Sequence, residues 1–116
     1  MEITGVTVGL PVSDLAASVA WYRRALEIDG AALEPGDGMV ELQVGPVWLQ
    51  LGQQDGPVLP GRTTTLLGVP DVAVQRQRLL GLGVEVGPVQ EVPGVIAWCD
   101  LADPDGNRLG LYTEQA

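Results

Sequence analysis

Hydrophobic residues occupy every second position in several short stretches of the chain, and this period of two predicts β-strands. The first stretch lies within residues 2–11, where valine and leucine alternate with smaller or polar residues. The period returns in residues 39–44 and 47–51, on the two sides of Gly45-Pro46. Two alternating segments joined by two such turn residues predict a β-hairpin.

Two segments have the spacing of an amphipathic helix, and each directly follows an aspartate that suits a helix N-cap. Asp14 precedes residues 15–26, and Asp71 precedes residues 72–82. The apolar stripe of the first helix consists of Leu15, Val19, Tyr22 and Leu26. Because Asp71 follows Asp14 by 57 residues, the pattern indicates a repeat within the chain.

Both halves predict the same order of elements. Further strands are expected within residues 31–33, 63–69, 83–93, 94–100 and 108–113, and a tight turn at Asp103-Pro104-Asp105-Gly106 precedes the last of them. Each half therefore reads as one strand, one helix and three strands. Two such βαβββ modules predict an α+β domain in which each helix covers one face of its sheet.

The length of 116 residues is that of one domain, and 46% hydrophobic with 18% charged residues is the composition of a chain that folds. We expect a single domain over residues 1–116. Its halves lie at about 1–54 and 62–116, and a Gly- and Pro-rich linker joins them near 52–62.

The chain contains no His, no Lys and no Phe. The absence of His excludes a Ser-His-Asp triad, a Cys-His dyad and any zinc site with a His ligand. A single cysteine, Cys99, has no partner for an intramolecular disulfide, and its apolar surroundings favour a buried hydrophobe over a nucleophile. No signal peptide or membrane-spanning stretch is recognisable, so we expect a cytoplasmic protein. The preference for Arg, Ala, Gly, Val and Leu suggests a GC-rich coding sequence, and we expect a bacterial protein.

Six Arg face fifteen Asp and Glu, which gives a net charge of −9. Such a chain repels the phosphates of nucleic acids and anionic membrane surfaces, and we expect neither as a partner. It attracts a cationic ligand. The same acidity also serves solubility, which is the alternative explanation.

Three sequence stretches carry a resemblance to a known superfamily. They are V-S-D-L-A-A-S-V-A-W-Y at 12–22, V-P-D-V at 69–72 and D-P-D-G-N at 103–107. Together with the repeat, they resemble the vicinal oxygen chelate superfamily, which includes glyoxalase I, bleomycin-resistance proteins and extradiol dioxygenases. The resemblance implies a fold in which the duplicated βαβββ module forms a cupped mixed sheet.

The metal enzymes of that superfamily take one ligand, usually His or Glu, from each of four strands. The corresponding positions here hold Thr7, Gln50, Thr64 and Gly110. Divalent cations need several anionic oxygens, nitrogens or sulfurs, and this set offers no carboxylate and no imidazole. We therefore expect no metal and no other cofactor.

Strand alternation divides the side chains into two faces. Val6 and its apolar neighbours at alternate positions are expected under the helices. The opposite face gathers aromatic and polar residues, as small-molecule sites do. The residues predicted to bind ligand are Thr7, Met39, Glu41, Trp48, Gln50, Thr64, Trp98, Asp100, Arg108 and Tyr112.

Other roles are open for parts of this set. The two Trp could instead serve packing or a dimer interface, Gln50 could bond a neighbour, and Arg108 could pair with Glu41 or Asp100.

Three functions remain. The first is a metal-independent protein that sequesters an aromatic, potentially cationic natural product or antibiotic. Resistance proteins of the superfamily work this way as homodimers with paired clefts, and no catalytic residue is then assigned. The alternative is a metal-free isomerase, lyase or cyclase that uses Glu41 or Asp100 as acid or base. The third is a degenerate domain with a structural or regulatory role.

Overall fold

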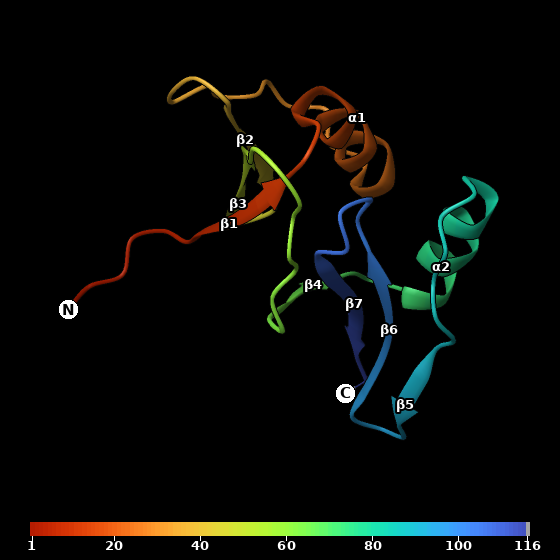
Figure 1. Cartoon of the computed structure of the whole chain (residues 1–116). Coiled ribbons are helices and arrows are strands. Elements are labelled where there is room, and N and C mark those ends of the chain that lie inside the picture. The colour runs from red at the N-terminus through yellow and green to blue at the C-terminus, as the bar shows by residue number, and fades with distance from the viewer. Residues whose placement is uncertain (116) are drawn as a thin grey trace. The chain divides into compact units, whose positions relative to one another are not determined.

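Two helices and seven strands make up the described part of this computed structural model, which covers residues 1–115 (Figure 1). The mixture of helices and mixed sheets confirms the predicted α+β class. The chain divides into two compact units, Met1–Pro60 and Gly61–Ala116. Ala116, the end of the second expected half, lies outside the described residues. Among residues 1–115, neither helix combines the length and apolarity needed to cross a membrane.

The first unit contains β1 (Thr7–Val12), α1 (Leu15–Leu26), β2 (Met39–Val44) and β3 (Val47–Gln53). Its sheet has the order β1-β3-β2, with β1 parallel and β2 antiparallel to the central strand β3. The predicted hairpin between β2 and β3 is confirmed, and Gly45 has the positive φ of 57° that glycine adopts without strain.

Two expectations for the first unit are corrected. The strand expected at 31–33 is reduced to a single bridge between Leu33 and Glu41, because breaker residues surround it. Val6 lies before β1 with half of its surface exposed, and it does not pack under the helix as expected. The Val6 carbonyl still accepts the Trp48 amide of β3 at 3.0 Å, so the backbone pairs there while the side chain stays outside the core.

The second unit contains β4 (Thr64–Gly68), α2 (Val72–Gly81), β5 (Gln90–Val92), β6 (Ile96–Ala102) and β7 (Arg108–Glu114). These elements have the complete predicted βαβββ order. The sheet order is β4-β7-β6-β5, with β4 parallel to β7 and the remaining pairs antiparallel.

Each unit buries the apolar face of its sheet against its own helix. In the first unit, Leu42, Leu49 and Leu51 are inaccessible to solvent, as is Tyr22 of α1. In the second unit, the buried residues include Leu79 of α2 and the strand residues Ala97, Cys99, Leu101, Leu109 and Leu111. A fully buried Leu contributes about 2 kcal/mol to folding, so these faces hold the units together.

Side chains from the sheets fasten the starts of both helices at equivalent positions. Gln53, the register partner of Val12, accepts the Leu15 amide and donates to the Ser13 carbonyl. In the second unit, Thr113 accepts the Val72 amide at 2.9 Å and donates to the Val69 carbonyl.

The predicted N-caps are confirmed as well. The Asp14 carboxylate accepts the Ala17 amide, and the Asp71 carboxylate accepts the amides of Ala73 and Val74. These bonds satisfy amides that have no partner within a helix.

The turn between β6 and β7 is organised around a buried carboxylate. Asp103 is 5% exposed and accepts the Asp105 amide, the Asn107 amide and the Asn107 side-chain amide at 2.8–2.9 Å. The prediction that Asp103 is a turn residue is confirmed. Since β7 begins directly after this turn, Asp103 helps to set the position of Arg108.

Asp103→Ala is predicted to lower the free energy of unfolding by about 2–3 kcal/mol, because it leaves buried donors without an acceptor. Urea denaturation measures the difference. Asp55→Ala, which removes an exposed loop carboxylate, is the control and should change stability by less than about 0.5 kcal/mol. Equal effects of the two substitutions would contradict this account of the turn.

Candidate functional site

The face of the first sheet that points away from α1 carries the predicted residues of that unit. Trp48 of β3 has Thr7 and Gln43 as register partners on its two sides. Gln50 likewise lies beside Glu41. Since Leu49 and Leu51, the alternate residues of β3, are buried, Trp48 and Gln50 must point to the other side.

Polar and apolar groups mix on this face. The Gln50 amide donates to the Glu41 carboxylate at 3.5 Å, a long hydrogen bond, and both side chains are half-buried. The possibility that Gln50 bonds a neighbour is thus realised in this structure. Trp48 and Met39 are also half-buried, so part of their apolar area remains accessible on this face.

A groove of about 600 Å³ lies at one end of the same sheet. Gln50 and Met39 line it together with Gly9 and Gly52, and Asp37 belongs to its rim. A Cβ placed on either glycine would meet no atom within 4 Å. The floor of the groove is therefore bare backbone with open space above it.

The second sheet carries the other five predicted residues on the face that points away from α2. Thr64 pairs in register with Arg108, and Trp98 pairs with Tyr112. Asp100 lies beside Gly110. The buried alternate residues Cys99 and Leu109 fix this orientation, as Leu49 does in the first unit.

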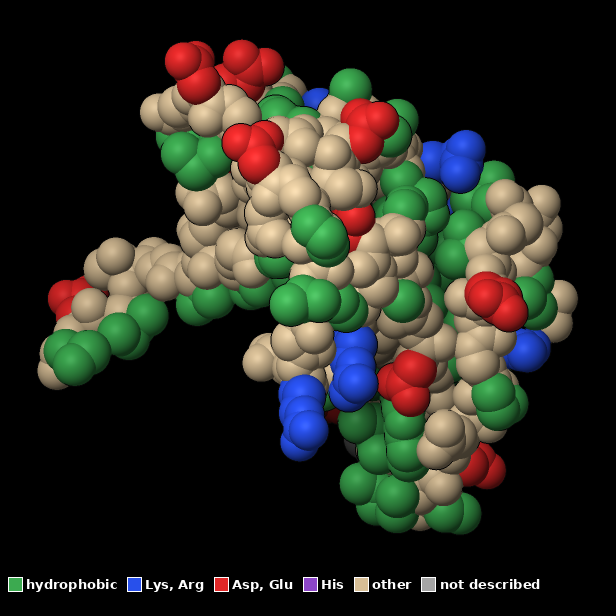
Figure 2. All heavy atoms as spheres, in the orientation of Figure 1, with side chains coloured by type: hydrophobic (Ala, Val, Ile, Leu, Met, Phe, Trp, Pro, Cys, Tyr) green, Lys and Arg blue, Asp and Glu red, His purple; other side chains and the backbone are tan. Residues whose placement is uncertain are grey.

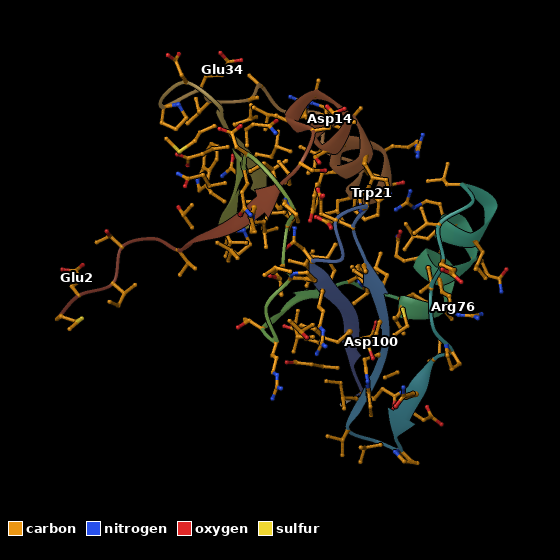
Figure 3. The ribbon with its side chains drawn as sticks, viewed as in Figure 1. Glu2, Asp14, Trp21, Glu34, Arg76 and Asp100 are labelled. Carbon is orange, nitrogen blue, oxygen red and sulfur yellow. The ribbon has the colours of Figure 1, made fainter. Side chains whose placement is uncertain are left out.

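Three of these five residues line one pocket. Thr64 of β4, Asp100 of β6 and Arg108 of β7 form it with Leu101 and Leu109, and its volume is about 440 Å³. Figure 3 shows Asp100 on its strand in this sheet. The pocket thus brings together a hydroxyl, a carboxylate and a guanidinium from three strands.

Tyr112 and Trp98 do not stack on each other although their strands are neighbours. The Tyr112 ring leans over Gly68 of β4, where an added Cβ would lie 3.0 Å from the ring and its hydroxyl. Among residues 1–115, the recorded ring contact joins Trp21 and Tyr22 of α1, with centroids 4.9 Å apart. Trp98 is half-buried.

Gly110 is covered by side chains of its neighbours. A Cβ at this position would lie 2.5 Å from Leu66 Cδ2 and 3.5 Å from Asp100 Oδ1. Leu66 therefore occupies the space into which a larger residue at position 110 would extend. This role of Leu66 was not predicted from the sequence; a glycine inside a strand, which marks a close approach, was the available signal.

The pairing of Arg108 with Asp100 is not observed within residues 1–115, where the Arg108 guanidinium has neither a hydrogen bond nor an ion pair; its pairing with Glu41 stays a prediction. Acidic side chains are spread over the visible surface among apolar ones (Figure 2). No group of three or more Cys, Asp or Glu in the described chain is arranged to hold a metal ion.

Cys99 lies directly beneath this face and is fully buried, as predicted. Burial raises the pKa of its thiol; the positive charge of Arg76 opposes the rise, and the negative charge of Asp100 adds to it. Figure 3 shows Arg76 on α2 and Asp100 on β6. The thiol is therefore protonated at neutral pH and has a packing role.

The structure thus brings Thr7, Met39, Glu41, Trp48 and Gln50 to one face of the first unit, and Thr64, Trp98, Asp100, Arg108 and Tyr112 to one face of the second. The boundaries of the pocket and the groove could not be predicted from the sequence, because they depend on which glycines lie beside the predicted residues on neighbouring strands. Ligand contact by these ten residues stays a prediction.

The chain matches one protein family and is similar to several proteins of known structure. The model of the family described as Glyoxalase-like domain matches residues 6–112. None of the curated proteins matches the chain. TnmS3, an antibiotic binding protein from Streptomyces sp. CB03234, is 28% identical, with a TM-score of 0.82 over 98% of each chain.

Two further solved structures have the same fold. An integron cassette protein from the mobile metagenome of the Halifax Harbour sewage outfall is 21% identical, with a TM-score of 0.80 over 96% of this chain and 99% of that one. The fosfomycin resistance protein FosX from Listeria monocytogenes is 18% identical, with a TM-score of 0.75 over 97% of this chain and 93% of that one. These two likenesses show the fold alone.

The raised pKa of Cys99 predicts a pH dependence of stability. The unfolded thiol loses its proton at a lower pH than the folded thiol, so the unfolded state binds fewer protons above about pH 8.5. The free energy of unfolding should therefore fall more steeply between pH 8 and 10 in the wild type than in Cys99→Ala. Urea denaturation at several pH values measures both slopes; parallel slopes would contradict the assignment.

Proposed function

Since the chain belongs to the glyoxalase-like domain family, of the vicinal oxygen chelate superfamily, we propose that it is a metal-independent protein that binds and sequesters a small aromatic molecule able to carry positive charge. The observation that carries the proposal is the helix-free face of each sheet. Those faces hold Trp48 and Trp98 with hydrogen-bonding and charged side chains beside them.

The aromatic part of the proposed ligand follows from the exposed area of the two Trp. Both Trp residues are half-buried and lie next to polar side chains, Gln50 and Glu41 in one unit and Asp100 in the other. Trp offers a large flat surface at little entropic cost, and its face attracts cations. The net charge of −9 adds a general attraction for a positively charged ligand.

Metal independence follows from the donors at the family's four ligand positions. Thr7 and Thr64 offer hydroxyls, Gln50 offers an amide, and Gly110 offers no side chain. Leu66 further fills the space above Gly110. This set does not fit a divalent cation, which needs anionic oxygen, nitrogen or sulfur ligands.

The likeness to TnmS3 supports binding as the activity. That protein is described as antibiotic binding, and the two chains correspond over nearly their whole length. We extend this to the chain as a proposal: its ligand is a natural product or antibiotic, and holding it away from its target gives protection.

The alternative of a metal-free enzyme requires a cavity carboxylate sheltered from water. Asp100 is exposed, which suits binding better than proton transfer. Glu41 is half-buried beside Gln50 and is the candidate acid or base if turnover occurs. Recovery of the ligand in unchanged form after binding separates sequestration from this alternative.

Trp48→Ala and Trp98→Ala are each predicted to weaken binding of proflavine, a planar aromatic cation, about tenfold, because each removes a stacking surface. Isothermal titration calorimetry measures the affinities without depending on Trp fluorescence. Wild-type affinity should be the same with and without EDTA.

Trp21→Phe is the matched control for these variants. It removes an indole from α1 but keeps an aromatic ring beside Tyr22, so its affinity should equal that of the wild type. Two results would contradict the proposal: no proflavine binding by the wild type, or unchanged affinity in both Ala variants. Loss of binding in EDTA would contradict metal independence.

A homodimer in the cytoplasm, each chain a single ligand-binding domain, completes the proposal. Leu66 on the edge strand β4 and Ile3 before β1 are well exposed, and exposed apolar groups near sheet edges favour association with a second copy. The lone buried Cys99 is compatible with a reducing compartment.

Light scattering after size exclusion is predicted to give about twice the chain mass of 12.2 kDa. Leu66→Glu should shift the mass toward that of one chain, since it replaces an exposed apolar side chain on the edge strand β4 by a charged one. The control is Leu59→Glu, which alters an exposed loop residue and should leave the dimer intact. A wild type of single-chain mass would rule the dimer out.

A further inference from the structure

Arg108 differs from the arginines that have structural roles. Arg23 and Arg76 donate to backbone carbonyls in the loops that follow their helices, and Arg78 donates to a glutamine of its own helix. Arg108 has no such partner within residues 1–115, and it lines the 440 Å³ pocket of the second unit. A guanidinium presents several donors that suit a carboxylate, so this group is available to an anionic part of a ligand.

Asp100 lines the same pocket with the opposite charge. Its register partner is Gly110, two residues along β7 from Arg108, so the two charged residues are diagonal neighbours on one face. They form no ion pair with each other within residues 1–115. Any pairing between such exposed groups would contribute about 1 kcal/mol or less, and a ligand that binds both charges can displace it.

The remaining surroundings favour a small polar group next to an aromatic one. Thr64, the register partner of Arg108, adds a hydroxyl that can both donate and accept. Trp98 lies two residues before Asp100 on the same face of β6, so an aromatic ring can rest near the charged pocket. Gly110 has no side chain of its own, and the apolar Leu66 covers it beside Asp100.

From this arrangement we infer that the pocket binds a zwitterionic, amino-acid-like group of the ligand, with Arg108 on its carboxylate and Asp100 on its ammonium group. The inference rests on the proposed function and deepens it by naming the ligand class. A chain of charge −9 disfavours a ligand of net negative charge, whereas a zwitterion satisfies Arg108 without adding net charge.

Four probes with one aromatic group and different charges test the inference. L-2-naphthylalanine is the zwitterion, its methyl ester carries the ammonium alone, its N-acetyl derivative carries the carboxylate alone, and the N-acetyl methyl ester carries neither. Calorimetry with the full chain gives their affinities. The wild type should bind the zwitterion about tenfold more tightly than either singly charged probe, because each charge-assisted contact contributes at least that factor.

Single variants assign the two contacts. Arg108→Ala should weaken binding of the zwitterion and the N-acetyl acid about tenfold and leave the methyl ester unchanged. Asp100→Asn should weaken the zwitterion and the methyl ester and leave the N-acetyl acid unchanged. The controls are Arg62→Ala and Glu114→Gln, which change exposed charges outside the pocket lining and should leave all four affinities unchanged.

The outcomes separate this inference from the proposed function. Equal affinity of the wild type for all four probes, or equal loss for all four in both pocket variants, would overturn the zwitterion site while aromatic binding stands. Proflavine binding without binding of any naphthyl probe would also overturn the inference alone. Failure of every probe, proflavine included, would overturn both.

Discussion

The two-residue period of the strands is the constraint on which the rest of the molecule depends. Because Leu49 and Leu51 are buried against α1, Trp48 and Gln50 must point to the opposite face of the sheet. A shift of the strand register by one residue would exchange the two faces. The same holds for Cys99, Leu109 and Leu111 against α2. The packing of the core therefore determines which side chains face a ligand, and the orientation of the proposed binding residues needs no further interactions.

Glycines give these faces their shape. Gly9 and Gly52 leave the floor of the first unit's groove bare, whereas Gly110 lies under Leu66 and beside Asp100. At Gly110 an apolar side chain from the neighbouring strand β4 fills the space that a larger residue would need.

The fold was predictable because its signals are local. Asp14 and Asp71 mark the helix starts, and the Gly45-Pro46 turn marks the hairpin, so the elements were found at nearly their true positions. The strand expected near residue 33 is reduced to one bridge with Glu41, because breaker residues surround it. Val6 was wrong for another reason: its backbone pairs with Trp48, but alternation in the sequence does not reveal that the core ends before its side chain.

The site was predictable only as a set of faces. The face on which each side chain lies follows from alternation along its strand. The direction in which Tyr112 leans, however, depends on Gly68 of the neighbouring strand β4, and the pocket around Arg108 is formed by three separate strands. The sequence also could not tell which polar side chains have partners: in the described part of the chain, Gln50 donates to Glu41, whereas the Arg108 guanidinium has no hydrogen bond or ion pair.

Nuclear magnetic resonance of the three Trp indole N–H groups, during titration with proflavine in the presence of EDTA, tests the central claim most directly. Trp48 and Trp98 lie on the proposed binding faces and Trp21 lies on α1. The account predicts that the signals of Trp48 and Trp98 shift while that of Trp21 does not. A shift confined to Trp21, or shifts that disappear when EDTA is added, would contradict it.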